Sequence, residues 1–419
     1  MKITSVKGTN DYLPKEVLIR DYLQSVILET YQSCGFERIM TPILEDIENL
    51  DKSEGGENLG LIYKILKRGD KLEKAINSNS FNELSDIGLR YDLTLPLSRY
   101  YANNRSKLIV PFKCIQIDKV YRAERPQKGR LREFVQCDID IIGNSSICAE
   151  MEAIDTTAKA LINIGISDFK VKINDRRLLR NILMNLGFIE NQLESVSIIF
   201  DKLDKIGATG VREELVSKGF LIESIDKLLL ILKDTPFTIE SARKYCKDDE
   251  IINNLEIIIN MVSDLSDGKY TIEYDMSLVR GQGYYTGTVF EIESANYRGA
   301  IAGGGRYDNL IGKFLNETVP AVGFSIGFER IYGIMIENNF EVPRNKKMVA
   351  VFYDFKDFNK AMLKAEDLRT TYNVTLFEKP NKIGKLLDKL KTQGYYAFYI
   401  QGQSDQLSIL EMNIILNKE

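Results

Sequence analysis

Residues 108–143 read LIVPFKCIQIDKVYRAERPQKGRLREFVQCDIDIIG. Two apolar runs flank a loop that contains proline and glycine, a pattern typical of paired antiparallel strands. Counting by two along the second run places Gln136, Asp138 and Asp140 on one face and the intervening apolar residues on the other. We expect the polar face to look into water or into a binding site.

The loop between these runs is strongly basic. Six basic side chains and one acidic side chain lie between Lys119 and Arg132. Arginine forks at strand ends suit the clamping of phosphate, and the same loop could follow a nucleic-acid backbone. An exposed basic hairpin without a ligand is the open alternative. Upstream, Asp92 and Thr94 in RYDLTLP share one strand parity, so we expect a second strand to add a carboxylate and a hydroxyl. Such a polar face could bind the ammonium group of a substrate, or it could be a solvent-exposed outer face of the sheet.

The 419 residues include no histidine. This excludes Ser-His-Asp and Cys-His nucleophile systems, and zinc sites that need an imidazole. Any enzyme must work with carboxylates, arginines, tyrosines and backbone groups. Five scattered cysteines predict reduced core thiols, and no apolar run is long enough to cross a membrane. We therefore expect a cytoplasmic protein without a membrane partner.

Periodicity predicts the remaining organisation. A helix is expected over residues 17–34, followed by a strand in FERIMTPILED that Pro42 stops. Residues 175–267 are nearly all helical and read as an insertion, and residues 270–332 should add two strands and a closing helix. After a boundary near residues 341–347, strands and helices alternate, which predicts a small α/β layer with parallel strands. From residue 344 onward, 13 basic and 9 acidic residues give a net +4, which fits a polyanion partner or an ordinary solvated face.

A second cluster, LVRGQGYYTG at residues 278–287, places three glycines around two tyrosines and Arg280. Glycines allow the backbone to approach a ligand closely. The cluster matches neither a Walker loop nor a dinucleotide fingerprint. GGGRY at residues 303–307 is more typical of a tight turn, although it could flank a pocket. Arg330 could reach a phosphate or pair with a surface acid.

Taken together, the segments resemble a known family. FERIMTP, YRAERPQKGRLREFVQCDIDIIG and AVGFSIGFERI are similar to the three ordered motifs of class II aminoacyl-tRNA synthetases, and RGQGYYTGTVFE with GGGRYD resembles the signature peptides of histidyl-tRNA synthetases. The resemblance implies an α+β fold with an antiparallel sheet flanked by helices. It also implies a catalytic domain in two parts (1–170 and 269–340), a helical insertion (171–268) and a trimmed C-terminal α/β anticodon-binding-like domain (346–419).

The family's activity would be a histidine–tRNA ligase that uses ATP with Mg²⁺, L-histidine and tRNA(His), in a homodimer. Two alternatives remain. One is a non-catalytic paralogue that senses histidine or tRNA, such as the regulatory subunit of ATP phosphoribosyltransferase. The other is an adenylating enzyme whose acceptor is not tRNA.

The resemblance also implies roles for individual residues. ATP would contact Arg122, Glu124, Phe134 and Arg330, and the tRNA acceptor end would meet Arg125 and Gln127. Histidine would contact Asp92, Leu93, Thr94, Arg122, Gln136, Asp140, Arg280, Tyr284, Tyr285 and Tyr307. Catalytic roles fall to Arg122, Arg280 and Arg330, and no protein metal ligand is implied. Gln282-Gly283 replaces the family's common Leu-Asp, so we expect weaker substrate binding, and the trimmed C-terminus should weaken anticodon contacts.

Overall fold

The computed structural model describes residues 2–53, 58–127, 129–233, 237–246, 248–280, 283–343, 346–403 and 406–410. The chain divides into two compact units, Met1–Phe340 and Glu341–Glu419. The division falls at the polar, proline-containing segment where the sequence predicts a boundary. Within the described residues, no helix combines the length and the apolar character that a membrane span requires.

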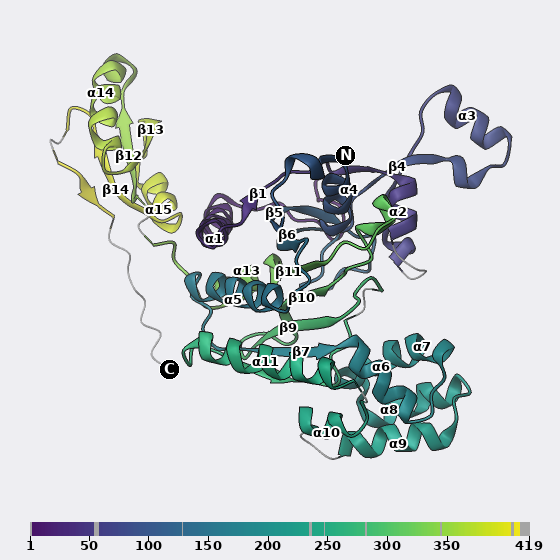
Figure 1. Ribbon diagram of the computed structural model, residues 1–419. Coiled ribbons are helices and arrows are strands. Elements are labelled where there is room, and N and C mark those ends of the chain that lie inside the picture. Colours follow the sequence, from purple (N-terminus) through teal and green to yellow (C-terminus); the bar gives the residue numbers. More distant parts are fainter. Residues whose placement is uncertain are drawn as a thin grey trace. The chain divides into compact units, whose positions relative to one another are not determined.

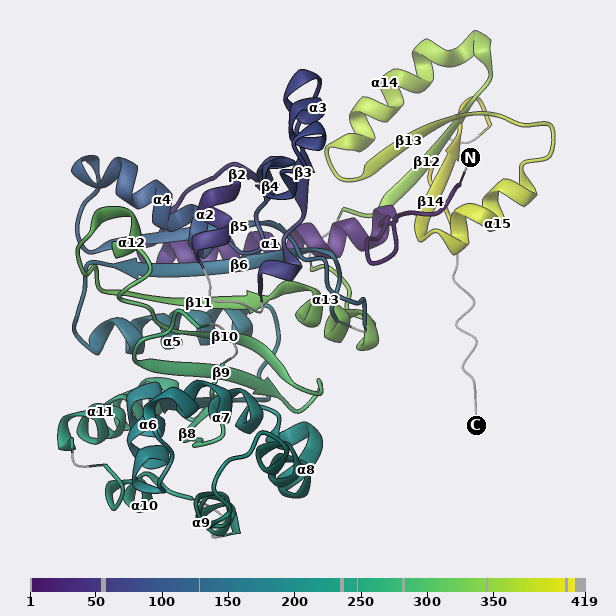
Figure 2. The same cartoon turned by 90° about the vertical axis from the view of Figure 1, so that its right-hand side faces the viewer.

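A large sheet forms the centre of the first unit (Figures 1 and 2). Among the described residues its strand order is β1-β5-β6-β11-β10-β9-β7-β8. The strands are β1 (Glu37–Arg38), β5 (Phe112–Tyr121), β6 (Glu133–Ile142), β7 (Phe169–Asp175), β8 (Thr271–Tyr274), β9 (Thr288–Ser294), β10 (Ala300–Arg306) and β11 (Ala321–Gly327). The inner pairs are antiparallel, whereas β1 and β8 run parallel to their neighbours. The expected α+β fold with an antiparallel hairpin, β5 and β6, is confirmed.

Three helices pack across one face of this sheet: α1 (Pro14–Ser33), α5 (Cys148–Asn163) and α11 (Asp249–Ser266) (Figure 1). The apolar residues of β6 supply the core on this side, since Cys137, Ile139 and Ile141 are fully buried. Because side chains alternate along a strand, the polar residues of β6 must point to the opposite face. The predicted alternation is therefore confirmed. Helix α13 (Phe328–Glu337) follows β11 directly.

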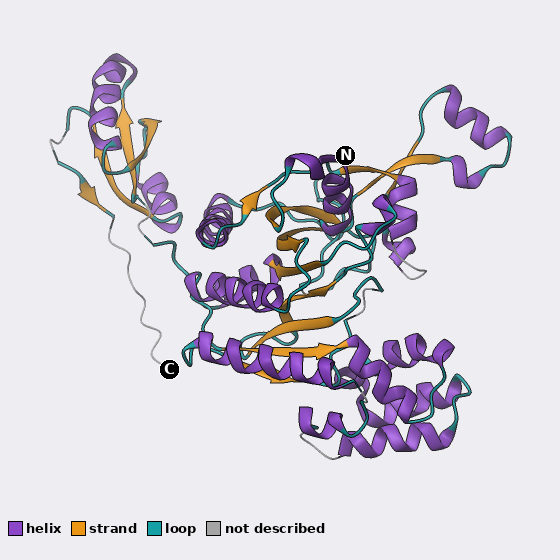
Figure 3. Cartoon of the chain, in the orientation of Figure 1, coloured by secondary structure: helices purple, strands orange, loops and turns teal. Residues whose placement is uncertain are grey.

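Smaller elements surround the sheet. The order β2-β4-β3 forms a second sheet from β2 (Leu44–Asp46), β3 (Lys64–Leu66) and β4 (Ser85–Leu89). Four further helices lie in this half of the unit: α2 (Ile47–Ser53), α3 (Asp70–Asn77), α4 (Thr94–Asn104) and α12 (Gly312–Leu315). Between β7 and β8 the chain is helical (Figure 3): α6 (Arg176–Asn185), α7 (Leu193–Phe200), α8 (Leu203–Ser217), α9 (Ile222–Lys233), α10 (Ile239–Arg243) and α11. The expected helical run is observed here.

The second unit is a small α/β layer. It contains β12 (Met348–Tyr353), α14 (Phe358–Arg369), β13 (Asn373–Glu378), α15 (Gly384–Thr392), β14 (Tyr395–Ile400) and β15 (Ser408–Ile409). Strand β12 pairs in parallel with both β13 and β14, as the alternation predicts, and β15 adds an antiparallel edge. Most of the segment whose trimming was predicted, residues 411–419, lies outside the described residues.

Four local predictions are wrong. RYDLTLP is not a strand: β4 ends at Leu89 and Thr94 begins α4, because the Asp92 carboxylate accepts the Leu95 N–H and organises the first helical turn. Residues 270–332 form four strands, not two. FERIMTPILED forms two short strands, β1 and β2, on either side of Pro42.

The GGGR of GGGRY belongs to strand β10, which Tyr307 follows, and is not a tight turn. Its glycines are needed because neighbours approach closely; a Cβ on Gly304 would collide with the Gly323 carbonyl oxygen. The run of glycines that was interpreted as a tight turn therefore reflects close packing between neighbouring segments.

Candidate active site

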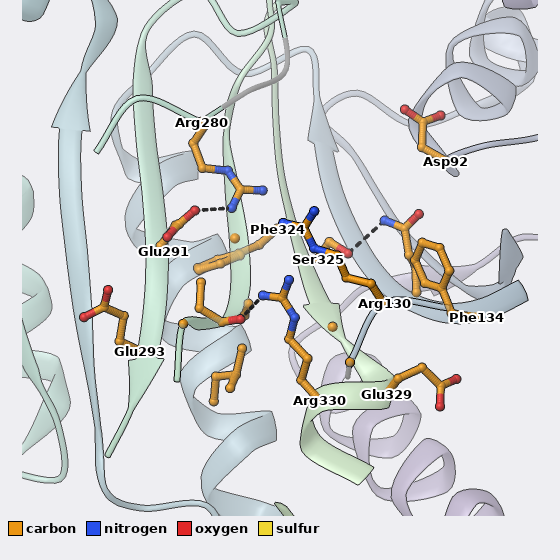
Figure 4. A pocket seen from close by; sticks show the side chains of 18 of the residues that line it. Asp92, Arg130, Phe134, Arg280, Glu291, Glu293, Phe324, Ser325, Glu329 and Arg330 are labelled. Carbon is orange, nitrogen blue, oxygen red and sulfur yellow. Dashed lines mark hydrogen bonds and ion pairs between the residues drawn. The ribbon is translucent and has the colours of Figure 1, made fainter. Parts of the chain in front are cut away.

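The polar face of the large sheet lines a cavity of about 1130 Å³ (Figure 4). Its floor comes from β6, β9, β10 and β11, and its rim comes from loops that precede or connect these strands. Asp92, Arg280 and Arg330 approach it from three different segments. The cavity therefore gathers charged groups that are distant in sequence.

The registers of the strands produce one row of residues across the floor. Asp138 lies opposite Ser325, Ser325 opposite Gly303, and Gly303 opposite Glu291. In the adjacent row, Asp140 lies opposite Gly323, where a Cβ would overlap the Asp140 carboxylate. Small residues on β10 and β11 thus leave room for the long or charged side chains of their neighbours.

Three buried carboxylates form the acidic wall of the cavity: Asp92, Asp138 and Asp140, each at most 4% exposed. Burial raises the pKa of Asp140 to about 7, although the hydrogen bond from Tyr307 acts to lower it. Burial also raises the pKa of Asp138 well above its ordinary value, and the neighbouring Asp140 adds to this. Burial likewise raises the pKa of Asp92.

Part of this acidic wall has no hydrogen-bond partner among the described residues. The unpartnered atoms are Asp92 Oδ2, Asp138 Oδ1 and Gln136 Oε1. The Gln136 side chain is oriented by its Nε2, which donates to Ser325 Oγ at 3.1 Å. Buried acceptors without partners are costly, so a cationic donor from a ligand would satisfy them.

Three tyrosines close the cavity beside Asp140. Tyr307 donates its hydroxyl to Asp140 Oδ1 at 2.5 Å. The ring centroid of Tyr284 lies 4.8 Å from that of Tyr285 and 5.9 Å from that of Tyr307. An aromatic wall next to a carboxylate of pKa near 7 suits a flat ring that carries N–H donors.

Arg280 forms the start of the basic wall. Its Nη1 donates to Glu291 Oε1 at 2.6 Å (Figure 4). Its backbone φ is 60°, in the left-handed region that non-glycine residues rarely adopt. A Cβ on Gly303 would occupy the space of the guanidinium, so a larger residue there would displace the arginine side chain. The arginine is thus held across the sheet by Glu291 and by the absence of a side chain below it.

The other cations lie along the loop and the β11–α13 junction. Arg122 Nε donates to the Tyr91 carbonyl at 3.0 Å, and its guanidinium lies 5.1 Å from the Phe134 ring centroid. Arg330 donates to the Ala300 carbonyl. Arg130 pairs with Glu124 at 3.5 Å. A planar ring over Phe134 would therefore lie beside several fixed positive charges.

At the far end of the cavity the charges neutralise one another. Lys172 Nζ lies 2.8 Å from Asp275 Oδ2 and 3.1 Å from Glu293 Oε1. Within the described residues, no group of three or more acidic or thiol side chains is arranged to hold a metal ion. This wall therefore offers charge pairs rather than a metal cage.

Most of the residues singled out in the sequence line this cavity. They are Asp92, Thr94, Arg122, Glu124, Gln127, Phe134, Gln136, Asp140, Arg280, Tyr284, Tyr285, Tyr307 and Arg330. Two do not: Leu93 is fully buried in the core and Arg125 is exposed outside the lining. Gln282, which together with Gly283 replaces the family's common Leu-Asp, lies outside the described residues.

The sequence interpretation missed other lining residues. Asp138 had the right strand parity but received no role, and Glu291 is the last residue of the signature peptide RGQGYYTGTVFE but also received none. Ser325, Arg130 and Arg298 also line the cavity. Parity could have found Asp138, and Arg130 belongs to the basic loop already singled out; the facing of Ser325 and Glu291 depends on strand register, which a single sequence does not reveal.

The arrangement has a clear chemical consequence. A cation with ring N–H groups fits the acidic and aromatic side, and a polyphosphate on a planar base fits the arginine side. The two would meet over Gln136 and Arg122, where an oxygen of one could face a phosphorus of the other.

Known proteins are similar to this chain over most of its length. A family model described as histidyl-tRNA synthetase matches residues 8–331. The histidine–tRNA ligase of Leifsonia xyli subsp. xyli (strain CTCB07) is 37% identical over 94% of this chain and 94% of its own. The probable histidine–tRNA ligase of Tropheryma whipplei (strain Twist) is 42% identical over 85% of each chain.

Solved structures agree with these relatives. The histidyl-tRNA synthetase from Nostoc sp. PCC 7120 has a TM-score of 0.76 at 27% identity, covering 95% of this chain and 91% of that one. The ATP phosphoribosyltransferase regulatory subunit/histidyl-tRNA synthetase from Bacillus halodurans C has a TM-score of 0.77, but at 20% identity over 95% and 98% of the two chains it supports the fold alone. On its motifs, its fold and these matches, the chain belongs to the histidyl-tRNA synthetase family.

Proposed function

We infer that the chain is a histidine–tRNA ligase, an ATP-dependent, AMP-forming enzyme. It converts ATP, L-histidine and tRNA(His) into histidyl-tRNA, AMP and pyrophosphate. The observation that carries the inference is the single cavity in which a buried acidic, aromatic wall faces a row of arginines. Those two walls match the two substrates of the first step.

In that first step, the carboxylate of histidine attacks the α-phosphorus of ATP. An oxygen–phosphorus bond forms, the bond to the β-phosphate oxygen breaks, and pyrophosphate leaves. Arg122 and Arg280 stabilise the charge that grows on the α-phosphate, and Arg330 fixes the base and the γ-phosphate. The nucleophile is already an anion, so no protein base is required. A chain without histidine can therefore carry out the reaction.

Recognition of the amino acid rests on the acidic wall. Asp92, Thr94 and Gln136 take the ammonium group, which satisfies the unpartnered buried oxygens of Asp92 and Gln136. Asp140 and Tyr285 bracket the imidazole nitrogens. Tyr284 and Tyr307 complete the pocket, and Leu93 supports it from the core.

The nucleotide and the tRNA occupy the other side. Phe134 stacks on the adenine, and Glu124 meets the base or the loop around it. Arg125 and Gln127 contact the acceptor end of the tRNA, consistent with their exposure. In the second step a tRNA hydroxyl attacks the carbonyl carbon of the mixed anhydride, the bond from that carbon to the phosphate oxygen breaks and AMP leaves, and a phosphate oxygen of the adenylate accepts the hydroxyl proton.

Magnesium enters this scheme with ATP. The carboxylates that could approach it, Glu291, Asp275 and Glu293, are paired with Arg280 or Lys172. Mg²⁺ keeps water and phosphate ligands readily. When bound, it supplies charge neutralisation at the β- and γ-phosphates, and the chain contributes few ligands of its own.

The enzyme is proposed to be a cytoplasmic homodimer. The FERIMTP segment and its neighbours expose large apolar side chains: Met40 is 73%, Leu44 50% and Ile43 39% exposed. A partner covering them would remove apolar surface from water. Residues 1–170 and 269–340 would form the catalytic domain, 171–268 the insertion, and 346–419 an anticodon-binding domain. Light scattering tests the dimer, and a Met40→Asp variant should shift it toward monomer.

Pyrophosphate exchange tests the activity. Labelled pyrophosphate should enter ATP only when histidine is present, and labelled histidine should then be transferred to tRNA(His). Histidine binding without exchange would instead indicate a sensor such as the regulatory paralogue. Exchange without transfer to tRNA would indicate another acceptor.

A further inference from the structure

We propose that Arg20 is a positioning residue for ATP, which acts through Glu329 on the residues that hold the nucleotide. Arg20 lies in α1, more than 300 positions before Glu329 in the chain. The proposal rests on the ATP roles proposed above for Phe134 and Arg330. It adds a residue outside the cavity lining to the machinery of the first step.

The Arg20–Glu329 contact is bidentate and buried. Arg20 Nη1 donates to Glu329 Oε2 at 2.7 Å, and Nη2 donates to Oε1 at 2.8 Å. The two side chains are 10% and 8% exposed. A paired fork of this kind fixes both the position and the orientation of the carboxylate.

Aromatic rings fix the guanidinium itself. It lies 4.1 Å from the ring centroid of Tyr12, 4.8 Å from that of Phe328 and 5.0 Å from that of Tyr332. Phe328 and Tyr332 belong to α13, whereas Tyr12 precedes α1. These three rings therefore hold the start of α13 against α1. An ion pair on the protein surface would not need such an aromatic environment.

Glu329 passes this constraint on in two directions. Its Oε1 accepts the backbone N–H of Val135 at 3.3 Å, between Phe134 and Gln136 on β6. Its own peptide is joined to Arg330, and Glu329, Phe134 and Arg330 all line the cavity (Figure 4). One carboxylate thus links the strand residue expected to stack on adenine with the arginine expected to cover it.

Arg20 also controls the charge that ATP meets. Without it, Glu329 would present an uncompensated and largely buried carboxylate to a cavity that must accept a polyphosphate. Unpaired buried charges are unfavourable, and like charges in a protected site repel strongly. Loss of Arg20 should therefore weaken the binding of ATP more than the binding of histidine, because histidine is proposed to bind beside different residues.

The test uses the full-length enzyme and three variants, R20Q, E329Q and R20Q/E329Q. We measure KM for ATP and for histidine separately in pyrophosphate exchange, with thermal unfolding alongside. R20Q should raise KM for ATP on the order of tenfold and leave KM for histidine within about twofold. The double variant should recover part of the loss, because removing the carboxylate removes the stranded charge.

A matched control is R99Q. Arg99 forms an equally close bidentate pair with the buried Glu45, and neither residue lines the cavity. R99Q should lower the unfolding temperature without changing the ratio of the two KM values. If R20Q unfolds the protein, R20K replaces it: it keeps the charge but loses the fork, so it should still raise the ATP KM above that of wild type while leaving the histidine KM within about twofold.

The possible failures can be told apart. Equal rises in both KM values for R20Q, an unchanged ATP KM in R20K with only lower stability, or a double variant no better than R20Q would each overturn the proposal. Phe134→Ala is measured in parallel. If it leaves the ATP KM unchanged, the proposed ATP site itself is wrong; if it raises that KM and R20Q does not, only the positioning role of Arg20 falls.

Discussion

The hydrogen bond between Tyr307 and Asp140 predicts a specific change in pH dependence. The Tyr307 hydroxyl donates to Asp140 Oδ1 and acts to lower a carboxyl pKa that burial raises to about 7. Tyr307→Phe removes this donor while keeping the ring against Tyr284. The Asp140 pKa should therefore rise further, and the anionic form proposed to receive the imidazole N–H should become scarcer at neutral pH.

The structure allows the size of this effect to be worked out. A hydrogen bond to a charged group contributes about 1.5–3 kcal/mol, which corresponds to a pKa rise of about one to two. Starting from the value of about 7, the ionised fraction at about pH 7.5 falls from about three quarters to between about 3% and 25%. The value of kcat/KM for histidine should therefore fall by about 3-fold to 25-fold at that pH.

The assay is histidine-dependent pyrophosphate exchange between about pH 6 and pH 9.5, since kcat/KM reports the ionisation of the free enzyme. The substrate's own ionisations are the same for both proteins, so the ratio of variant to wild type isolates Asp140. That ratio should climb toward one as pH rises. Tyr284→Phe is the control and should lower kcat/KM by a factor that does not vary with pH. A constant ratio for Tyr307→Phe would refute the reasoning.

Three other predictions concern Asp140 and Gly303 in the cavity and the buried Glu150–Arg306 pair outside its lining. Between about pH 4 and 7, Asp140 binds more protons in the folded protein than in the unfolded chain, so the free-energy cost of burying its carboxylate grows as pH rises, up to about 4 kcal/mol. In urea unfolding, the stability of Asp140→Asn relative to wild type should therefore be greater at pH 8 than at pH 5. An equal stability difference at the two pH values would contradict this. Gly303→Ala should displace Arg280 and lower exchange on the order of 100-fold, whereas Gly333→Ala, which meets open space on α13, should not. Glu150→Gln breaks a buried ion pair with Arg306 and should lower the free energy of unfolding in urea by about 3–5 kcal/mol. Asp155→Asn, which removes the more exposed pair with Lys159, should lower it by near zero. Equal losses for the two variants would contradict the importance of the buried pair.

Much of the fold could be predicted because its signals are local. Alternation along β6 separates Asp138 and Asp140 from Ile139 within a few residues, and the helical period of the insertion repeats over many turns. RYDLTLP was wrongly expected to be a strand because its residues alternate as in a strand. Instead, the Asp92 carboxylate accepts the Leu95 N–H at the start of α4, and this single side-chain contact favours a helix over the alternating pattern. The glycines of β10 misled because their cause lies on other segments: the Gly323 carbonyl of β11 takes the space of a Cβ at Gly304, and the Arg280 guanidinium, from the loop before β9, takes that space at Gly303.

The site was less predictable, since its precision depends on register and on distant pairs. Glu291 meets Arg280 because the loop before β9 places the guanidinium over Gly303 of β10, and Glu329 meets Arg20 because α13 packs against α1. Neither pair has a spacing that a pattern could reveal. The resemblance to a family supplied the roles of lining residues, but not the residues that hold them in place.

The distribution of charge in the cavity explains why the reaction can proceed without a protein imidazole. Asp92 and Asp138 keep buried oxygens without partners among the described residues, whereas Arg280 is held by Glu291 on the opposite side of the glycine-lined floor. In the proposed scheme, a substrate ammonium drawn to the first wall leaves its own carboxylate directed toward the second, where the phosphate would be bound. Attraction at both walls therefore orients nucleophile and phosphorus before any bond changes, and orientation of this kind replaces proton transfer as the main source of rate.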